Sequence, residues 1–362
     1  GRLADVRNLG DGGSSDVYAP SVVTPLRGLQ DGFEGWEVVH HGDLDLDAAA
    51  AADVAVVVVG YTRDDEGEFI GDDGTRHLRD LLPGPDDPEE AAAFEAMLAT
   101  EDLPPLAPGS VPPRGEAGFS TGGDRASLRL RPEDEALIAG VAAAQPRTVV
   151  AVISGSAVVM EAWCHDATAI VQLWYSGMEG GAALADVLGG RAEPTGRLPF
   201  TIPTDDAHLP PFDRDASAVT YDAWHGYWLL ARHRRQAAYP FGFGLSYTEW
   251  AIGPTTLEEQ GDDLVVTTEV HNRGTRPGAD VVQVYAGRPA DPSRPARRLV
   301  AFQRVEVEAG SHVEAQLRIP WTRLAVRDPE AHAWTIAPGT YVLTVGRHAA
   351  DLDAVDLLVD RA

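Results

Sequence analysis

The chain has 362 residues, of which 44% are hydrophobic, and this is enough for two domains with separate cores. It carries 29 basic and 56 acidic residues, giving a formal net charge of −27, and it contains no lysine. Nucleic acids and anionic membranes attract basic surfaces, so this charge argues against both as partners. The single cysteine, Cys164, excludes an intrachain disulfide and argues against a cysteine-based metal site.

The clearest strand of the chain lies near its beginning. Residues 53–60 read Asp-Val-Ala-Val-Val-Val-Val-Gly, and such a β-branched, uncharged run predicts a strand buried in a parallel sheet. Before it we expect a short helix with Pro25 in its first turn and a strand at residues 36–40. An alanine-rich helix is expected at residues 47–52, with Asp47 as its N-cap.

A crowded group of acidic residues follows this strand: Asp64, Asp65, Glu66 and Glu68. Like charges held close together raise the pKa of at least one carboxyl group, which suits a general acid. From composition alone, a solvated acidic turn is the simpler interpretation.

A long polar insertion rich in proline, glycine and acidic residues then covers residues 71–122. Within it, Pro88 to Leu98 is predicted to form a helix. A loop of this length in a compact domain is either functional or mobile. After the insertion, residues 132–144 predict an amphipathic helix with Pro132 at its first position.

Two further apolar runs complete the predicted sheet. Residues 149–153 are followed by Ser-Gly-Ser at 154–156, and residues 169–175 are followed by a glycine-rich turn at 177–181. A helix is expected at 182–188. Short β-rich runs followed by glycine turns and helices are typical of a mostly parallel sheet covered by helices. In such sheets, the turns at the carboxyl ends of the strands carry ligands.

Beyond an aromatic and glycine-rich connector, the sequence pattern predicts only β-strands. The aromatic side chains of this connector either stack on sugar rings or pack the connector onto its neighbours. Short alternating runs separated by Gly, Pro and Asn turns then predict a small sandwich of fibronectin type III character: 264–270, 281–285, 312–319 and 341–345. The predicted fold is therefore an α/β sandwich at 1–205, a connector at 206–249 and an all-β sandwich at 250–362.

Two runs carry a specific resemblance. Residues 175–188 read Tyr-Ser-Gly-Met-Glu-Gly-Gly-Ala-Ala-Leu-Ala-Asp-Val-Leu, and residues 194–203 read Pro-Thr-Gly-Arg-Leu-Pro-Phe-Thr-Ile-Pro. Both resemble the C-terminal α/β domain of glycoside hydrolase family 3, the β-glucosidase and β-xylosidase family. Residues 239–247, Tyr-Pro-Phe-Gly-Phe-Gly-Leu-Ser-Tyr, are similar to a further signature of this family. Residues 272–285 are similar to its fibronectin-like domain, so the resemblance covers almost the whole chain except the insertion.

The resemblance implies a retaining, exo-acting β-glycosidase. Such an enzyme uses two carboxyl groups about 5–5.5 Å apart, one as nucleophile and one as general acid and then base. In the family the nucleophile is an Asp on a (β/α)₈ barrel that precedes this region. No eightfold strand–helix repeat occurs here, and the sequence starts Gly1-Arg2-Leu3 without Met. We therefore expect this chain to be the C-terminal half of such an enzyme, inactive alone.

The resemblance also implies which residues belong to the site. Family members often carry the acid/base on the loop after the 53–60 strand, in a Glu-x-Glu-Gly or Gly-Glu-Gly context. An ungapped match places it at Glu68, and a gapped one at Glu66. We favour Glu68, although the glycine expected after it is missing. Asp124 and Arg125 match an Asp-Arg pair of the family, and Arg125 either orients a carboxylate or forms a structural salt bridge.

The expected substrate is a β-linked glucoside or related glycoside, and the expected partner is a barrel domain of the same enzyme or of a second chain. No cofactor is implied, and four scattered histidines show no metal-ligand spacing: His40, His41, His165 and His225. The alternative is a non-catalytic carbohydrate-binding module or partner subunit that docks on a separate barrel chain. The docking face would then hold Glu66, Glu68 and residues 177–181. Glu179 is expected to favour the start of the following helix electrostatically. Homo-oligomerisation and cellular location stay open.

Overall fold

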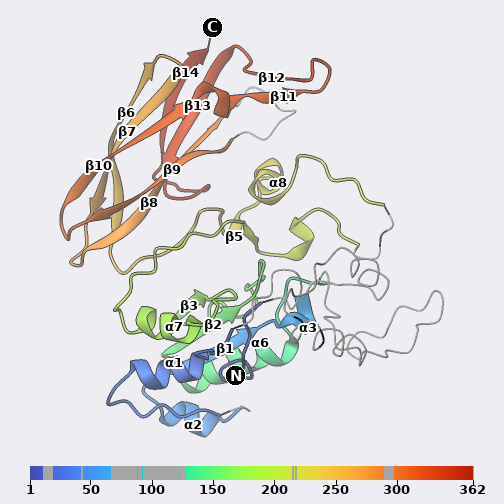
Figure 1. The fold of residues 1–362 in the computed structure, drawn as a ribbon, viewed down its shortest axis with the longest axis vertical. Helices are drawn as coiled ribbons and strands as arrows, with labels where there is room; N and C mark the ends of the chain where they lie inside the picture. Colours follow the sequence, from blue (N-terminus) through green and yellow to red (C-terminus); the bar gives the residue numbers. More distant parts are fainter. Residues whose placement is uncertain are drawn as a thin grey trace.

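The computed structural model describes residues 1–10, 19–41, 44–66, 88, 92, 125, 127–213, 216, 218–288 and 297–361. An α/β part is followed by a connector and a β-sandwich (Figure 1). Glu68, Asp124 and the predicted helix and loop of the 71–122 insertion, apart from Pro88 and Ala92, lie outside the described residues. Within the described residues, no helix is long and apolar enough to cross a lipid bilayer.

Three parallel strands form the sheet of the α/β part, as the sequence predicts. They are β1 (Ala55–Gly60), β2 (Thr148–Ile153) and β3 (Ala169–Gln172), in the order β1-β2-β3. Ala55 pairs with Thr148 and Gly60 with Ile153, so β1 and β2 end level with each other. The carboxyl ends of the strands therefore share one edge of the sheet.

Helices cover both faces of this sheet. Alternate side chains of β1 separate into two cores: Val57 and Val59 pack on the side of α6 (Pro132–Ala144), whereas Val58 packs on the side of α7 (Gly180–Leu188). Burial on both faces explains the uninterrupted valine run. The elements that complete these two layers are α2 (Leu46–Ala51), packed against α6, and α1 (Pro25–Gly32), packed against α7.

Helices α1 and α7 cross at two glycines. A Cβ on Gly28 would lie 2.0 Å from the backbone of Gly181, and a Cβ on Gly181 would lie 1.9 Å from Thr24 O. No other residue allows backbones to approach this closely. The glycine-rich turn after β3 is therefore also a packing surface for the N-terminal helix.

Three local predictions were wrong in detail. Residues 36–40 form no strand, because Trp36 N donates to Phe33 O in a turn after α1 and its side chain is exposed. The cap of α2 is Asp45, whose side chain accepts from Ala48 N, whereas Asp47 lies in the first turn. Strand β3 ends at Gln172, and beyond it the backbone of Trp174 adopts a positive φ of 59°.

The C-terminal part is a two-sheet antiparallel sandwich around one core, as the alternating runs predict. One sheet has the order β10-β7-β6 and the other has the order β14-β13-β8-β9. The strands are β6 (Trp250–Gln260), β7 (Asp263–Asn272), β8 (Gly278–Gly287), β9 (Arg298–Val307), β10 (His312–Pro320), β13 (Gly339–Gly346) and β14 (Val355–Arg361). A small hairpin of β11 (Val326–Asp328) and β12 (Ala333–Thr335) follows η3 (Trp321–Leu324).

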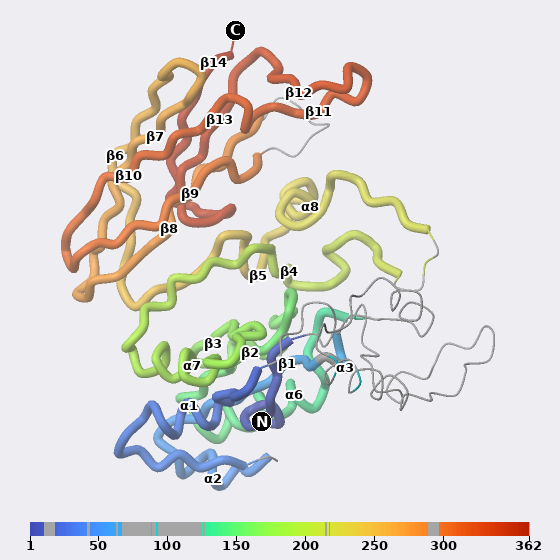
Figure 2. The backbone as a smooth tube through the Cα atoms, viewed as in Figure 1, coloured from blue at the N-terminus to red at the C-terminus, as the bar shows by residue number. Residues whose placement is uncertain are grey.

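The connector lies between the two parts (Figure 2). It holds β4 (Ile202–Pro203), η2 (Asp206–His208), α8 (Gly226–Arg232) and β5 (Ala237–Tyr239). Tyr227 and Phe241 each place a ring against Tyr285 of the sandwich, with centroids 6.3 and 6.4 Å away. These two aromatic side chains therefore pack the connector onto the sandwich, which is one of the two roles expected from the sequence.

A buried ionic joint ties the α/β part to the sandwich. The side chain of Asp280 is 1% exposed, and one of its oxygens pairs with Arg197 of the Thr-Gly-Arg-Leu-Pro run at residues 195–199. The other oxygen lies 2.6 Å from Arg347 Nε. A buried carboxylate with two guanidinium partners is stable only while all three charges stay together.

We expect Asp280→Asn to lower the free energy of unfolding by about 3 kcal/mol, because two largely buried arginines would lose their shared anion. Urea denaturation of the chain measures this change. Asp263→Asn is the matched control in the same sandwich, since its partner Arg318 is 53% exposed and such a pair contributes less than about 1 kcal/mol. Equal effects of the two changes would contradict the role given to the joint.

The N-terminal turn of α6 buries a carboxyl group, Asp134, which is 3% exposed and lies 3.6 Å from Arg2 Nη2. Burial raises the pKa of Asp134 above its ordinary value of 3.8, against the opposing effects of Arg2 and of a hydrogen bond from the Gly60 backbone. Its neutral form therefore stabilises the fold below pH 3.8, and this contribution is lost as pH rises through the raised pKa.

Asp134→Asn cannot ionise, so we expect the variant to gain stability relative to the wild type as pH rises from 4 to 7. Denaturation midpoints measured at several pH values check the sign of this difference. Glu37→Gln removes a carboxylate from an exposed position elsewhere in the α/β part and controls for the change in net charge. A variant curve parallel to the wild-type curve would contradict the assignment.

Candidate functional site

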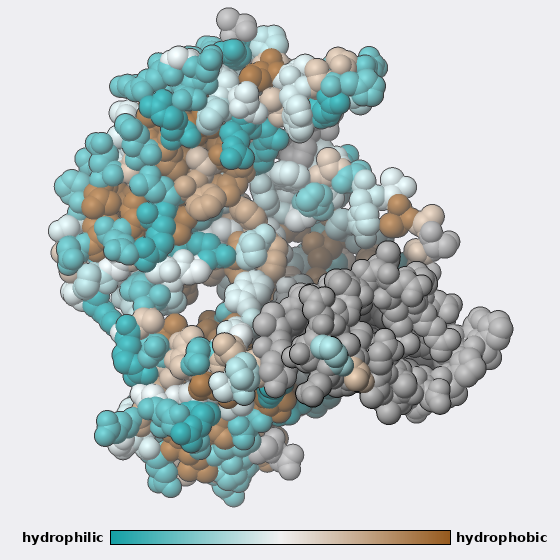
Figure 3. Space-filling view, viewed as in Figure 1, coloured by the Kyte–Doolittle hydropathy of each residue, from teal (hydrophilic) through white to brown (hydrophobic). Residues whose placement is uncertain are grey.

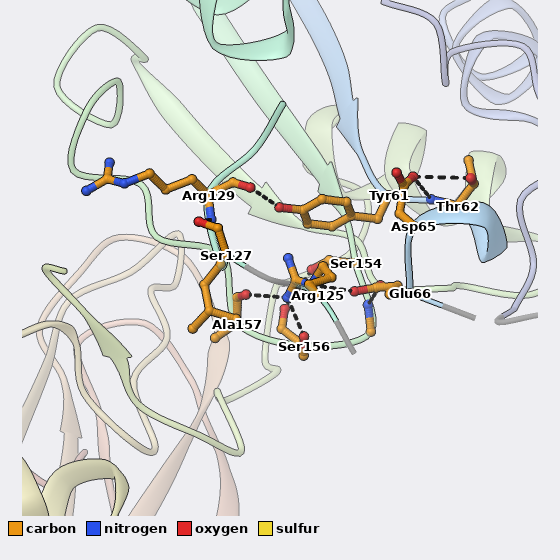
Figure 4. A network of polar contacts seen from close by, with 12 residues as sticks. Tyr61, Thr62, Asp65, Glu66, Arg125, Ser127, Arg129, Ser154, Ser156 and Ala157 are labelled. Carbon is orange, nitrogen blue, oxygen red and sulfur yellow. Dashed lines mark hydrogen bonds and ion pairs between the residues drawn. The ribbon is translucent and has the colours of Figure 1, made fainter. Parts of the chain in front are cut away.

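The site lies at the edge of the sheet where the parallel strands end. After β1 the chain forms the short helix α3 (Arg63–Glu66), and after β2 it forms a loop at residues 154–157. Figure 4 shows side chains from these segments, with Arg125, pointing toward one another. Ligands of open α/β sheets bind at this edge, so its side chains are the candidates for function.

Glu66 lies at the centre of the polar network. Its Oε1 accepts a hydrogen bond from Gly155 N and another, of 2.8 Å, from the Tyr175 hydroxyl. Its Oε2 lies 3.2 Å from Arg125 Nε, and the Glu66 side chain is 9% exposed. The carboxylate thus contacts three parts of the chain: the segment after β2, the segment after β3, and Arg125.

Arg125 holds the other side of this network. Its Nη2 donates to Ser156 Oγ at 2.5 Å and to Ala157 O at 2.8 Å. The guanidinium carbon lies 4.1 Å from the centre of the Tyr61 ring, within the range of a cation–π contact. The Arg125 side chain is 7% exposed, and its Nη1 has no hydrogen-bond partner among the residues that the structure describes.

Two tyrosines act as neutral donors around the ion pair. Tyr61 donates to Arg129 O, and Tyr175 donates to Glu66. Burial raises the pKa of both hydroxyls, and the negative charge of Glu66 raises that of Tyr175 further. Both side chains therefore remain protonated at neutral pH and serve as fixed hydrogen-bond donors.

The predicted acidic group divides into separate environments. Asp65 Oδ2 accepts from Thr62 N at 2.9 Å and from Thr62 Oγ1 at 3.2 Å, and its Oδ1 pairs with Arg131. Asp65 therefore organises the first turn of α3. Asp64 is exposed. Of the described acidic residues in this group, only Glu66 is placed among the strand ends.

The other candidates are peripheral to this network. Glu179 occupies the N-cap position of α7, but its side chain is exposed and makes no capping hydrogen bond. Within the described part of the chain, no group of three or more His, Cys, Asp or Glu residues has the geometry to hold a metal ion.

Sequence reasoning did not identify Tyr175, Gly155 or Tyr61 as partners of Glu66 and Arg125. A local signal existed for Gly155, which lies in a Ser-Gly-Ser run directly after a strand. A Cβ at this position would lie 3.3 Å from Glu66 Oε1 and 3.3 Å from the Tyr175 ring. Next to Tyr175, the positive φ of Trp174 is uncommon for a bulky residue and bends the chain at the end of β3.

Solved structures share this fold. A GH3 β-glucosidase from Bifidobacterium adolescentis is 25% identical, with a TM-score of 0.73 over 96% of this chain and 46% of its own. A β-D-glucoside glucohydrolase from Trichoderma reesei has a TM-score of 0.76 over 97% of this chain and 47% of its own, and at 20% identity it shows the fold alone. The fold of this chain therefore corresponds to less than half of a GH3 β-glucosidase chain.

Sequence comparison agrees with this similarity of fold. Residues 1–247 match the glycosyl hydrolase family 3 C-terminal domain, and residues 280–349 match the fibronectin type III-like domain. The chain belongs to glycosyl hydrolase family 3.

Two curated relatives show how much of a full-length member the chain represents. A xylan 1,4-β-xylosidase from Xylanibacter ruminicola is 32% identical over 71% of this chain and 29% of its own length. A β-glucosidase from Rhizobium radiobacter is 37% identical over 64% of this chain and 30% of its own length. The chain therefore matches less than one third of the length of each of these two relatives.

We expect Arg125→Met to lower the free energy of unfolding by about 3 kcal/mol, because it leaves the buried Glu66 carboxylate without its cation. Urea denaturation followed by tryptophan fluorescence measures the change. Arg129→Met is the matched control, since its pair with Asp205 spans 3.5 Å between side chains 38% and 50% exposed and contributes at most about 1 kcal/mol. A loss no larger than that of the control would show that the Glu66–Arg125 pair is not a structural element.

Proposed function

We propose that this chain is the C-terminal half of a retaining, exo-acting β-glycosidase of the β-glucosidase type. It supplies the general acid/base and part of the sugar site to a (β/α)₈ barrel that holds the Asp nucleophile. The substrate is a β-linked glucoside or related glycoside. The names of the two curated relatives and the share of their length that the chain matches support this proposal.

The acid/base in this proposal is Glu68, with Glu66 as the alternative. The observation that carries the choice is the environment of Glu66, whose two oxygens are both occupied by protein donors at a buried position. A general acid must instead reach the glycosidic oxygen to within about 2.6–3.2 Å. Glu68 follows two residues later and is the carboxylate that the ungapped match to the family selects.

The proposed reaction has two steps. In the first, Glu68 protonates the departing glycosidic oxygen while the barrel Asp attacks the anomeric carbon. In the second, Glu68 takes a proton from the water that hydrolyses the glycosyl-enzyme, and the free sugar retains its configuration. Without the barrel Asp there is no nucleophile, so this chain alone has no turnover.

Arg125 and Asp124 belong to the sugar side of the proposed site. Of the guanidinium nitrogens of Arg125, Nε and Nη2 already serve Glu66 and the 154–157 loop. Nη1 has no hydrogen-bond partner among the described residues but is itself buried, so the proposed contact of Arg125 with the sugar rests on the resemblance. Asp124 keeps its role as a sugar-binding residue on the resemblance alone.

A second candidate function is a non-catalytic module that docks on a separate barrel chain. Although the coloured part of the face shown in Figure 3 is mostly hydrophilic, Met178 in the loop after β3 is 43% exposed at the same edge of the sheet. A single exposed apolar side chain is ordinary on a protein surface, so this candidate rests mainly on the resemblance to a domain that accompanies a barrel. Such a module would co-purify with a barrel chain, and no carboxylate of its own would be required for turnover.

The test uses the enzyme in which this chain and its barrel are present together. Glu68→Ala and Glu66→Ala are assayed separately on an aryl β-glucoside with and without azide. We expect Glu68→Ala to lower kcat/KM for a poor leaving group by about 10²–10⁴-fold. Azide should restore turnover of an activated substrate by Glu68→Ala and yield the β-glycosyl azide.

Two outcomes would contradict the assignment. Rescue of Glu66→Ala alone would make Glu66 the acid/base. Full activity of both variants would show that neither carboxylate takes part in catalysis, and would favour the docking module.

A further inference from the structure

We infer that Glu66, Arg125, Tyr175 and Gly155 form a clamp that fixes the start of the loop carrying the acid/base, and that Glu66 is a positioning residue. This inference rests on the proposed function. The four residues are called the Glu66 clamp below. Its members come from four separate places in the sequence, and each contact joins the chain after β1 to a different segment.

The clamp connects segments that are remote in sequence. Tyr175 is 109 residues from Glu66, and Gly155 is 89 residues away, yet both donate to the same Oε1 atom. Arg125 approaches Oε2 to 3.2 Å. The Glu66–Arg125 pair also brings together the two residues that flank positions 67–124. Since two residues of chain span at most about 7 Å, fixing Glu66 restricts where the backbone two positions later can lie.

The chemistry of the partners suits an anchor and not a proton donor. Gly155 N–H and Arg125 Nε–H can only donate hydrogen bonds, so they match a carboxylate oxygen and not the O–H of a carboxylic acid. With Tyr175 also donating, the described surroundings of Glu66 offer its carboxyl group hydrogen-bond donors from three directions. A residue in this setting holds a position, whereas a general acid must exchange its proton in each catalytic cycle.

The burial of the charged pair of the clamp, Glu66 and Arg125, holds the clamp in place. Glu66 and Arg125 are 9% and 7% exposed, so water replaces a lost partner poorly and the remaining charge is left uncompensated. Arg125 is itself held by Ser156 and Ala157, so the anchor is attached to the loop after β2 on both of its sides. At residue 155, a Cβ would lie 3.3 Å from Glu66 Oε1 and from the Tyr175 ring, so a larger residue would press against both side chains.

The test compares Glu66→Gln and Tyr175→Phe with Glu68→Ala in the barrel-containing enzyme, across aryl β-glucosides whose leaving groups differ in pKa. A displaced general acid penalises leaving groups that need protonation and spares those that do not. We expect Glu66→Gln to lower kcat/KM for poor leaving groups by about 10²-fold, the effect of a misplacement of about 1 Å. The kcat/KM for activated leaving groups should fall little, and azide should not restore activity, because the variant displaces the Glu68 carboxyl group without removing it.

Tyr175→Phe keeps the ring and removes one hydrogen bond, so it reports on the clamp even if Glu66→Gln folds poorly. We expect kcat/KM for substrates with poor leaving groups to fall about tenfold, which corresponds to the loss of one hydrogen bond to a charged group. The double variant should lose less than the product of the two single losses, because both changes act through one carboxylate. Glu161→Gln, at an exposed position after β2, is the matched control and should behave as the wild type.

The outcomes separate the inference from the function on which it rests. If Glu68→Ala shows neither leaving-group dependence nor azide rescue, the proposed function fails. Suppose that Glu68→Ala behaves as an acid/base variant. If Glu66→Gln then lowers kcat/KM equally for all substrates, or leaves kcat/KM unchanged for all of them, only the clamp is refuted. Azide rescue of Glu66→Gln would also refute it, because it would mean that Glu66 exchanges the proton.

Discussion

The buried ion pair between Glu66 and Arg125 is the interaction on which the arrangement of the site depends. Three parallel strands bring their carboxyl ends to one edge of the sheet, but strands alone do not fix the loops that leave them. Glu66 supplies one carboxylate to which two of the loops and Arg125 attach. Because the pair is desolvated, its partners must remain in place together, and this makes the sheet edge a defined surface.

The same physical device recurs at the joint between the α/β part and the sandwich. Asp280 is enclosed between Arg197 and Arg347, and like Glu66 it accepts from groups that are distant in sequence. Arginine suits both places because its planar guanidinium presents several donors in fixed directions. Arg125 uses two nitrogens for three acceptors and still stacks on Tyr61. A chain without lysine and with a net charge of −27 thus places arginines where buried carboxylates need them.

Local sequence predicted the regular elements well where a single physical signal dominated. The valine run of β1 and the Pro-initiated helix α6 were predicted with nearly the observed bounds, because burial on two faces and a helix-starting proline leave clear patterns. Residues 36–40, Trp-Glu-Val-Val-His, contain side chains that favour strands, but the turn from Phe33 to Trp36 leaves this segment without a partner strand among the described residues. Strand-favouring side chains alone do not make a strand, since packing and pairing decide it.

The sequence by itself determined the family, the two-part fold and the acidic group after β1, because these depend on local patterns and on ordered motifs. Only the tertiary structure decided that Asp65 organises α3 while Glu66 is buried between Arg125, Tyr175 and Gly155. Adjacent carboxylates with the same local propensity differ only in what the folded chain brings against them. Those partners lie 59 to 109 residues away along the sequence, where no spacing rule can identify them, and they meet because parallel strands end at a common edge.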